Sequence, residues 1–489
     1  MTSVLLEALA EHARLRPHQL AVREVAPPSA LRSLTWSELY GAACRAAGRL
    51  GEGRRVLVCA PNGIELLVAI LGGLRAGAWI LPISPDVPET ELRADARAAR
   101  ATTAIAAAPA LGRLSDLVAE LIPLESLAQT GSPRSASERA SISGSLLLKT
   151  SGTTGVPRLV RRAAAALDAV GMSCQRVIGV GESDTMLVAI PLWHSYGIDQ
   201  AVLCAMIAGC ALELQRGFDP GQVRSALLQR EISVLPGVPV IFDALARQAR
   251  QPVVAPRLRR AYSAGSPLPR RVFDAFERSF GVKLGQIYGA TEFGSATFND
   301  PDAADFDSGA AGRPLPGVSL RILEADAPSL DRVLPAGCEG QLAVSAASMF
   351  SEYLDADGSA VERGFLLSGD LGHLDGSGRL WLTGRLRLLI DVGGIKVNPL
   401  EVESVLLRHP GVRDAVVLPA PMSDITSRLR AVIVPEPGTE ISADELRHFA
   451  RLHLIHYKVP RSFEIREDVP RSSTGKILRG ELRSRVEQA

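Results

Sequence analysis

The chain has 489 residues, with 54 lysines and arginines, 53 aspartates and glutamates, and 46% hydrophobic residues. This length predicts roughly two to four domains with a large apolar core. The formal net charge of +1 removes the usual electrostatic argument for a protein that binds nucleic acid or a membrane surface.

The start of the chain and its apolar runs give no sign of secretion or membrane insertion. Residues 1–15 contain Glu7 and Glu11 and no basic segment before the apolar run, so they do not resemble a signal peptide. The longest apolar runs are broken or too short to span a bilayer. The six cysteines are scattered without a CxxC pair, and we expect buried free thiols in a cytoplasmic protein. They are Cys44, Cys59, Cys174, Cys204, Cys210 and Cys338.

In chain order, short apolar runs alternate with stretches of helical spacing as far as about residue 300. This alternation predicts an α/β fold with a largely parallel sheet. Residues 128–142, rich in Ser, Ala and Arg, are expected to form a loose connection. Strands are expected at 56–59, 79–83, 185–191, 210–214, 232–235 and within 255–264, and helices at 4–15, 64–76, 200–208, 223–230 and 269–280.

The pattern changes from about Gly309 onward. Short alternating runs with Gly and Asp turns, at 340–345 and 374–381, predict an antiparallel β subdomain. After Arg385, a last segment of about a hundred residues has mixed strand and helix patterns, enough for a small α+β domain. We therefore predict an N-terminal domain over 1–386 and a C-terminal domain over 387–489.

The most informative run is LLLKTSGTTGVPR, from Leu146 to Arg158. An apolar strand leads into small hydroxyl residues and glycines, whose N–H and O–H groups suit the oxygens of a polyphosphate, and a cation follows. The chain contains no GxxxxGK[ST], so this is not a Walker A loop. A plain Ser/Thr/Gly surface turn is the alternative. The residues expected on the phosphates are Thr150, Ser151, Gly152, Thr153, Thr154, Gly155 and Arg158.

This string resembles the TSGTTGxP[KR] signature of the adenylate-forming superfamily, which includes acyl- and aryl-CoA ligases, luciferase-like enzymes and stand-alone adenylation enzymes. Further motifs of the superfamily follow in the family's order, so the resemblance extends over essentially the whole chain. It implies a large N-terminal core, with mixed, largely parallel sheets, and a small mobile C-terminal domain. It also implies ATP and Mg²⁺ as partners in catalysis.

The next motif is QIYGATEFG, Gln286 to Gly294. The resemblance implies that Tyr288 stacks on adenine beside Gly289, that Thr291 contacts the α-phosphate, and that Glu292 binds magnesium. Tyrosine offers a stacking face, and a carboxylate is a hard oxygen ligand for Mg²⁺. Upstream, the run 263–267 matches the family's small-residue loop, whose backbone, at Gly265, approaches adenine and the acyl group.

Later motifs complete the nucleotide site. In LLSGDLGHLD, Asp370 matches the family's ribose-binding carboxylate, and Arg385 resembles an arginine near ribose and phosphate. The family's hinge follows two residues later, and this chain has Arg387 where Asp or Lys is common. In PRSSTGKILRGELR, Lys476 matches the lysine that reaches the carboxylate and the α-phosphate. It is one of only five lysines among the 54 basic residues. In a chain that otherwise uses arginine, a lysine indicates a position that needs a compact ammonium.

The mechanism implied is attack of a carboxylate on the α-phosphorus of ATP, with release of pyrophosphate, followed by attack of a thiol on the acyl adenylate. Both first reactants are anions, so positioning and electrostatic stabilisation must supply the rate. In relatives the C-terminal domain then swings about the hinge and presents the segment with Gly393 and Gly394 to the pantetheine arm. Glycines suit such a close approach.

The expected acid pocket is apolar and aromatic, which favours a neutral aryl or aliphatic acid. His194 is equally compatible with a core role and with a role at the carboxylate. Amino-acid-activating relatives usually have Asp where Ser195 stands, which argues against an amino acid, although Asp199 is a second possible ammonium ligand. The expected lining is Trp193, His194, Ser195, Tyr196, Gly197, Val238, Ser263, Ala264 and Ala290.

The thiol is expected to be coenzyme A, because the run 457–461, YKVPR, resembles acyl-CoA ligases. Phosphopantetheine on a separate carrier protein has the same reactive arm and is the first alternative. A non-catalytic acyl or nucleotide binder is the second, and the intact Glu292, Asp370, Arg385 and Lys476 argue against it.

Overall fold

A computed structural model describes residues 3–26, 30–127, 144–150, 158–249, 253, 255–354, 361–392, 395–423, 426–472 and 475–484. The chain divides into two compact units, which are described separately. The first contains residues 1–152, 156–319 and 344–365, and the second contains 153–155, 320–343 and 366–489. The predicted domain boundary after residue 386 stays a prediction. Residues 128–142, the predicted loose connection, lie outside the described ranges.

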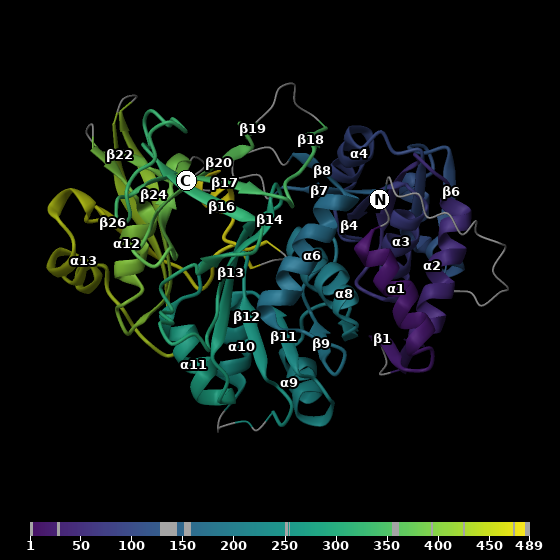
Figure 1. Ribbon diagram of the computed structural model, residues 1–489. Coiled ribbons are helices and arrows are strands. Elements are labelled where there is room, and N and C mark those ends of the chain that lie inside the picture. Colours follow the sequence, from purple (N-terminus) through teal and green to yellow (C-terminus); the bar gives the residue numbers. More distant parts are fainter. Residues whose placement is uncertain are drawn as a thin grey trace. The chain divides into compact units, whose positions relative to one another are not determined.

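A nine-stranded sheet forms one layer of the first unit (Figure 1). Its six central strands pair in parallel, and β2, β14 and β15 are antiparallel at the two edges. In sheet order the strands are β15 (Arg313–Pro314), β14 (Gly294–Asn299), β13 (Leu284–Ala290), β12 (Arg260–Ser263), β11 (Val234–Gly237), β9 (Thr185–Val188), β10 (Ala211–Gln215), β1 (Leu20–Ala26) and β2 (Ala30–Thr35).

A seven-stranded sheet forms the second layer, and β3, β4, β5, β6 and β7 pair in parallel within it. Strands β8 and β18 extend this sheet in antiparallel pairing. In sheet order the strands are β18 (Glu352–Tyr353), β8 (Leu159–Ala163), β7 (Ser145–Lys149), β4 (Trp79–Ile83), β3 (Arg55–Cys59), β5 (Thr103–Ala106) and β6 (Glu120–Pro123).

Helix α3 (Ile64–Arg75) packs against strands of both sheets. Its middle is apolar on every side and buried, as expected for a helix between two layers. A Cβ on Gly73 would lie 2.2 Å from Ile80, so glycine is needed for this close packing. The other helices of this unit are α1 (Val4–Leu15), α2 (Trp36–Leu50), α4 (Glu89–Ala98), α5 (Ala108–Leu114), α6 (Ala164–Ile178), α7 (Ser195–Gly197), α8 (Met206–Ala208), α9 (Pro220–Gln229), α10 (Pro239–Gln248) and α11 (Arg270–Phe280), with a 3₁₀ turn at Leu124–Ser126 and a π-helix at Ile198–Ala205.

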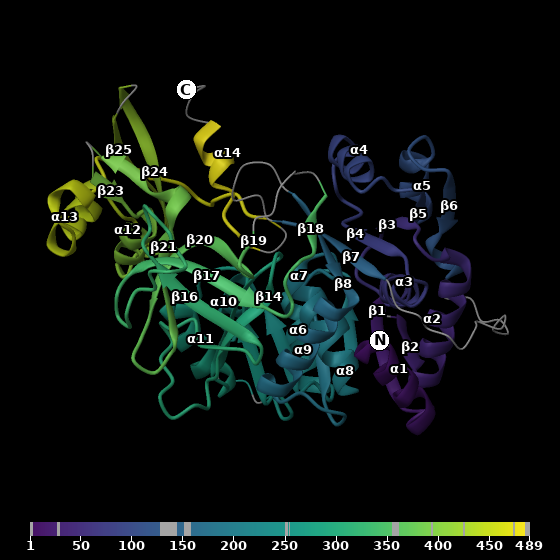
Figure 2. The same ribbon diagram turned by 45° about the horizontal axis from the view of Figure 1, so that its top comes forward.

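In the second unit, the antiparallel strands β24 (Val412–Ser423) and β25 (Thr426–Pro435), with β26 (Ser462–Ile465), form a sheet that is covered on both faces. Val417 and Ile433 face α12 (Pro399–Leu406) and α13 (Ala443–His453), whereas Val416 and Val432 face the C-terminal segment with α14 (Arg479–Ser484). In Figure 2, α13 and α14 lie on opposite sides of β24. The remaining elements of residues 318–458 are β16 (Val318–Leu323), β17 (Gly340–Ala346), β19 (Val361–Glu362), β20 (Phe365–Leu374), β21 (Leu380–Arg385), a 3₁₀ turn at Leu386–Leu388, β22 (Ile390–Val392), β23 (Ile395–Val397) and a 3₁₀ turn at His456–Lys458.

The mixed α/β fold is confirmed, with three local corrections. The expected helix 200–208 is largely a π-helix, because helical spacing in a sequence does not distinguish i→i+4 from i→i+5 bonding. The run 374–381 contains the turn between β20 and β21. Cys338 is exposed, in a turn after Pro335, while the other five cysteines are buried. No described helix is long and apolar enough to cross a bilayer.

Candidate active site

Thr150 and Arg158 close the base of the predicted phosphate loop. Strands β7 and β8 form an antiparallel pair in which Lys149 lies opposite Leu159. Beyond that pair, the Thr150 N–H donates to the Arg158 carbonyl at 2.8 Å, and the Arg158 N–H donates to the Thr150 hydroxyl at 3.0 Å. Residues Ser151, Gly152, Thr153, Thr154 and Gly155 lie outside the described ranges, so their contacts with phosphate stay predictions.

Tyr353 joins the loop base to the predicted magnesium ligand. Strand β18 pairs with β8 and brings the Tyr353 ring centre to 5.2 Å from the Arg158 guanidinium carbon. The Tyr353 hydroxyl donates to Glu292 Oε1 at 3.4 Å. No sequence motif marked Tyr353, because its place depends on strand pairing across almost two hundred residues.

The predicted acid segment meets the predicted nucleotide segment at a pair of hydroxyls. Ser195, at the start of α7, has its Oγ 3.4 Å from the Thr291 Oγ1. Glycine is needed on both sides of this contact. A Cβ on Gly197 would lie 2.1 Å from the Pro191 carbonyl oxygen, and a Cβ on Gly289 would lie 2.4 Å from the Gly294 carbonyl oxygen.

Tyr196, Val238 and the run 263–265 are further predicted residues of the acid pocket. The Tyr196 hydroxyl donates to the Tyr262 carbonyl at 3.2 Å, and burial raises the pKa of Tyr196 well above its usual value. Gly265 has φ +84°, and a Cβ there would lie 3.5 Å from Val238. The Ala264 N–H donates to the Gly237 carbonyl at 3.1 Å. Trp193, in the loop before α7, and Ala290, at the end of β13, are both partly buried.

Ser263 and Tyr288 complete the predicted set. Ser263 is buried at the end of β12, and within the described residues its hydroxyl has no hydrogen bond. Tyr288 is on β13, with its ring centre 5.9 Å from that of Phe293. The structure therefore brings the predicted acid and nucleotide residues of the first unit onto the ends of neighbouring strands.

His194 is a neutral imidazole at physiological pH. Burial, with a smaller contribution from the nearby Lys149 ammonium, lowers the pKa of His194 from 6.5 to about 4. A neutral ring can donate one hydrogen bond to a carboxylate without adding a net charge to the site.

This shift predicts a stability difference with a definite sign. The unfolded chain takes up a proton on His194 below about pH 6.5, but the folded chain does so only near pH 4, so stability falls as the pH falls through this window. Between pH 7.5 and 5.0, wild type should lose at most about 2 kcal/mol more unfolding free energy than His194→Gln. Urea unfolding of both proteins at each pH measures this, and equal losses would contradict the assigned protonation state.

Asn62 holds the chain just before the acid segment. Its side chain is buried, with Oδ1 accepting the Leu192 N–H and Nδ2 donating to the Ile190 carbonyl, both at 2.8 Å. Asn62 comes from the turn between β3 and α3, so the two sheets of the unit share this contact. Sequence analysis missed it because the partners are 128 and 130 residues apart.

Asn62→Ala should weaken both stability and acid binding. The change leaves the Leu192 N–H and the Ile190 carbonyl buried without a partner, which costs about 1–3 kcal/mol for such a group. We expect a lower urea midpoint and a higher KM for the acid, with the KM for ATP less affected. Asn62→Asp, which keeps the acceptor, should lie between. Wild-type values for Asn62→Ala in both measurements would show that Asn62 does not position this segment.

In the second unit, Asp370 and Arg385 face each other across the β20–β21 pair. They are register partners, and Arg385 Nε is 2.5 Å from Asp370 Oδ1. The Asp370 N–H donates to the Ser368 hydroxyl at 3.1 Å. The two residues predicted to lie near ribose are therefore adjacent. Gly393 and Gly394 lie outside the described ranges, so their role at the pantetheine arm stays a prediction.

Arg387, at the predicted hinge, is in the 3₁₀ turn after β21. Asn398 links the two sides of this turn, since its Nδ2 donates to the Thr383 carbonyl at 2.6 Å and its Oδ1 accepts the Leu400 N–H at 3.0 Å at the start of α12. A Cβ on Gly384 would lie 2.3 Å from the Asn398 side chain, so this position requires glycine.

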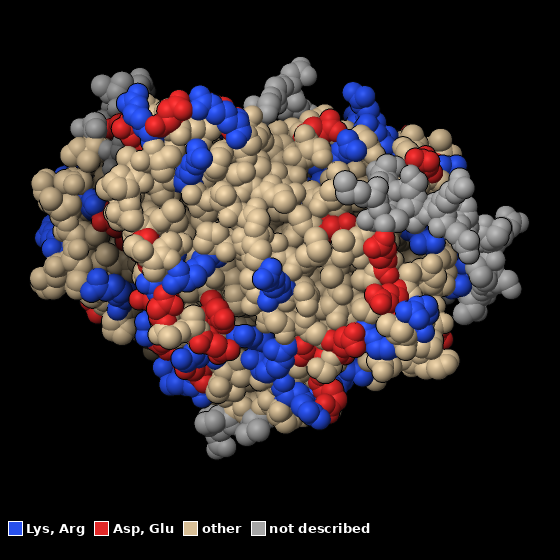
Figure 3. Space-filling view, viewed as in Figure 1, with Lys and Arg blue, Asp and Glu red and all other residues tan. Residues whose placement is uncertain are grey.

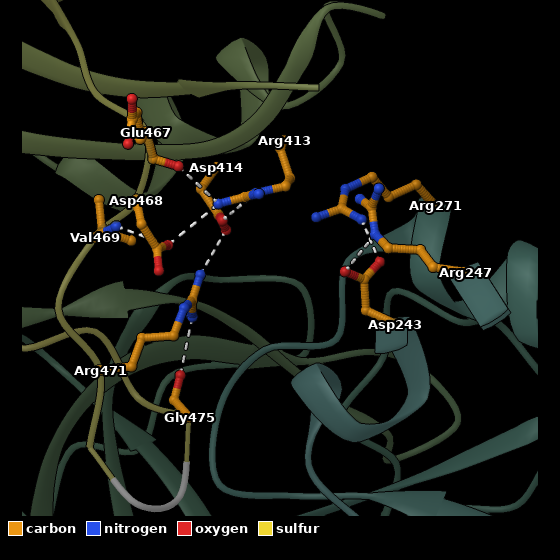
Figure 4. A network of polar contacts seen from close by, with 10 residues as sticks. All are labelled: Asp243, Arg247, Arg271, Arg413, Asp414, Glu467, Asp468, Val469, Arg471 and Gly475. Carbon is orange, nitrogen blue, oxygen red and sulfur yellow. Dashed lines mark hydrogen bonds and ion pairs between the residues drawn. The ribbon is translucent and has the colours of Figure 1, made fainter. Parts of the chain in front are cut away.

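Lys476 is held on a short turn whose backbone is fixed at both ends. The Lys476 N–H donates to the Ser472 hydroxyl at 3.1 Å, and the Ser472 N–H donates to the Lys476 carbonyl at 2.8 Å. Figure 4 shows Arg471 between the Gly475 carbonyl, at 2.9 Å, and Asp414 Oδ1 of β24, at 2.6 Å. The backbone that presents Lys476 is thus attached to the central sheet of its unit.

The donor set of the first unit fits the magnesium ion that the family implies. Within the described ranges, no three His, Cys, Asp or Glu side chains cluster as metal ligands. Mg²⁺ bound with a nucleotide needs only one or two carboxylates, because phosphates and water supply the rest. Glu292, beside the loop base, suits that role. On the face seen in Figure 3, the coloured charges of both signs are interspersed, which agrees with the balanced composition.

Comparison with known proteins identifies the class. A family model described as "AMP-binding enzyme" matches residues 9–354, and a model described as "AMP-binding enzyme C-terminal domain" matches residues 401–476. The chain therefore belongs to the AMP-binding enzyme family, and its predicted resemblance to adenylate-forming enzymes is confirmed.

Individual relatives narrow the class to ligases. The chain is similar to a feruloyl-CoA synthase of an Amycolatopsis species, at 30% identity over 97% of each chain. It is similar to 4-coumarate–CoA ligase 2 of Solanum tuberosum, at 28% identity over 88% of this chain and 84% of that protein. Its fold is similar to that of ATP-bound MatB from Rhodopseudomonas palustris, with TM-score 0.88 and 25% identity over 100% and 99% of the two chains. The protein is an AMP-forming ligase of the acyl-CoA synthetase type.

Proposed function

We propose that this ligase converts a neutral aryl or aliphatic carboxylic acid to its acyl-AMP, using ATP and Mg²⁺, and then transfers the acyl group to coenzyme A. The observation that carries the proposal is the contact between Ser195 and Thr291, 3.4 Å apart. It joins the apolar acid segment to the residue proposed to bind the α-phosphate, so the acid and the phosphorus that it attacks would be neighbours.

Each proposed group has a defined task in the first half-reaction. The Thr291 hydroxyl and Arg158 would bind phosphate oxygens, and Lys476 would neutralise the carboxylate and the α-phosphate as they approach. Magnesium, when bound by Glu292, supplies positive charge to the leaving pyrophosphate. Tyr353 would fix the orientation of Glu292 through its hydrogen bond. Asp370 would accept hydrogen bonds from the ribose hydroxyls, a charge-assisted contact that suits a carboxylate.

Within the class of neutral acids, we favour an aryl acid over an aliphatic one and over an amino acid. The proposed lining includes Trp193, Tyr196 and Val238, which suit an aryl group, and Ser195 at the expected ammonium-binding position argues against an amino acid. The second candidate for an ammonium ligand, Asp199, is already engaged, since Arg162 lies 2.8 Å from its Oδ1. Relatives named for feruloyl-CoA and 4-coumarate–CoA act on aryl acids, and we extend that preference to this chain.

Acid-dependent pyrophosphate exchange across a panel tests the proposal. The panel would contain benzoates, hydroxycinnamates, fatty acids and amino acids at equal concentration. We expect exchange that requires Mg²⁺ and is greatest with an aryl acid. Mass spectrometry with coenzyme A or a pantetheinylated carrier protein then identifies the acceptor. Pyrophosphate exchange with amino acids alone would overturn the proposed substrate. Acyl transfer only to the carrier protein would overturn the proposed acceptor. Absence of exchange with every acid would overturn adenylation itself.

A further inference from the structure

A completely buried ion pair lies behind the proposed site of the first unit. Arg162 on β8 and Asp199 in the π-helix have side chains 0% and 2% exposed, with Arg162 NH1 2.8 Å from Asp199 Oδ1. The other carboxylate oxygen accepts the Ser295 N–H at 3.1 Å and lies 3.4 Å from the Ser295 hydroxyl. Asp199 therefore contacts β8 and β14 at once, from a third element.

Each of these three elements continues directly from one proposed site segment. β8 begins immediately after Arg158, at the base of the phosphate loop. Asp199 follows the acid segment 193–197, and Ser295 follows Thr291 and Glu292. The Asp199 carboxylate is therefore bonded to residues just after the phosphate loop and just after the Thr291–Glu292 segment. Asp199 itself lies just after the acid segment.

The turn after Glu292 is built closely around this pair. Gly294 has φ +70°, and a Cβ there would lie 2.8 Å from Arg162 NH2 and 3.1 Å from Asp199 Oδ2. Glycine is therefore required by both the backbone conformation and the lack of space. The turn is therefore attached to the pair through the Ser295 N–H and leaves no room for a side chain beside Arg162, so a movement of Asp199 would move the turn.

Stability alone does not account for the pair. Removing two charges from water costs as much as their attraction returns, and apolar residues of similar size are often as stable or more stable. Arg162 is also not fully satisfied, because within the described residues its Nε and NH2 make no hydrogen bond. A directional group that fixes geometry is the better explanation of its presence.

We infer that Asp199 is a positioning residue, which through Arg162 and Ser295 sets the acid segment, the Thr291–Glu292 turn and the base of the phosphate loop in register for adenylation. The inference rests on the proposed function and adds to it a group that contacts neither substrate. Misplacing a reacting group by about 1 Å costs on the order of 10²-fold in rate, so a distant support can have a large effect.

The test compares two buried carboxylates in the same unit. Asp199→Asn removes the charge that faces Arg162. Glu213→Gln is the matched control, because Glu213 is buried on β10, lies 2.7 Å from Arg23 and contacts no proposed site residue among the described ones. Both variants should melt at a lower temperature. Measured well below those temperatures, only Asp199→Asn should lower kcat for pyrophosphate exchange, by about 10²-fold, and raise the KM for the acid.

An apolar double variant separates positioning from stability. Arg162→Met with Asp199→Leu should recover the wild-type melting temperature without recovering kcat. Recovery of kcat together with stability, or unchanged kcat and KM in Asp199→Asn, would overturn the inference. If the double variant does not fold, the comparison of kcat and of the KM for the acid between Asp199→Asn and Glu213→Gln decides.

Hydrogen exchange keeps this test independent of the reaction. Asp199→Asn should speed amide exchange in 193–197 and 289–295, whereas Glu213→Gln should not. If wild type shows no pyrophosphate exchange with any acid, the proposed function fails while this measurement still tests the positioning. If wild type shows pyrophosphate exchange, but residues 193–197 and 289–295 have the same amide protection in both variants, the positioning role of Asp199 is overturned and the proposed function stands.

Discussion

Lys476→Ala should lose adenylation and keep thioester formation. The ammonium is proposed to neutralise two anions as they meet, and removing one such stabilising group costs about 10²–10³-fold in kcat. The thiol step needs no such neutralisation, so the variant should still convert a synthetic acyl-AMP and coenzyme A to the thioester. Pyrophosphate exchange measures the first half-reaction, and release of AMP from the supplied adenylate measures the second.

Lys476→Ala should leave the backbone of its turn in place. The turn is held by Ser472, Arg471 and the Gly475 carbonyl, and none of these contacts uses the lysine side chain. Lys283→Ala is the control, because Lys283 is an exposed lysine in the first unit. Equal loss of both half-reactions in Lys476→Ala would refute the proposed division, and so would loss of exchange in Lys283→Ala.

Glu403→Ala should cause the largest loss of stability in the second unit. Glu403 is buried on α12, with Oε2 2.6 Å from Arg479 NH2 and Oε1 accepting the Val417 N–H at 2.6 Å. Burial raises the pKa of Glu403, and the charge of Arg479 opposes that shift. Removing one member of a buried pair costs about 3–5 kcal/mol, because the other is left uncompensated.

A neighbouring glutamate on the same helix supplies the control. Glu401 accepts from Lys458 at 2.7 Å, but its side chain is 45% exposed, and exposed pairs contribute about 0–1 kcal/mol. Two measurements compare Glu403→Ala with Glu401→Ala. Denaturant unfolding of the whole chain gives the unfolding free energy, and limited proteolysis of the native protein gives the rate of cleavage near α14. Similar losses in the two variants would mean that the Arg479 pair does not hold the C-terminal segment on its sheet.

The motifs could be predicted from the sequence because each is local. Thr150 directly follows β7, Thr291 directly follows β13, Ser195 begins α7 and Asp370 lies within β20, but each is part of one continuous run of sequence that carries its motif. The parallel strands and the helix α1 also followed from periodicity, and α1 begins and ends at the expected residues.

The supports of these motifs could not be predicted. Asn62 with Leu192, Tyr353 with Glu292, and Arg162 with Asp199 are pairs 130, 61 and 37 residues apart. No periodicity relates such partners, because their proximity depends on the order of strands in a sheet. Asp199 illustrates the difference, since the sequence offered an ammonium ligand for a residue that the fold buries against arginine.

The interrupted course of the second unit affects how this enzyme can be recombined with its relatives. That unit takes residues 320–343 as well as everything from 366 onward, so its sequence is discontinuous. A chimera joined at residue 386 would combine β17, β20 and β21 from one parent with the β24–β26 sheet and the turn of Lys476 from another. Exchange of all the segments of the unit together would keep its native neighbours, and is the recombination that we expect to preserve solubility and turnover.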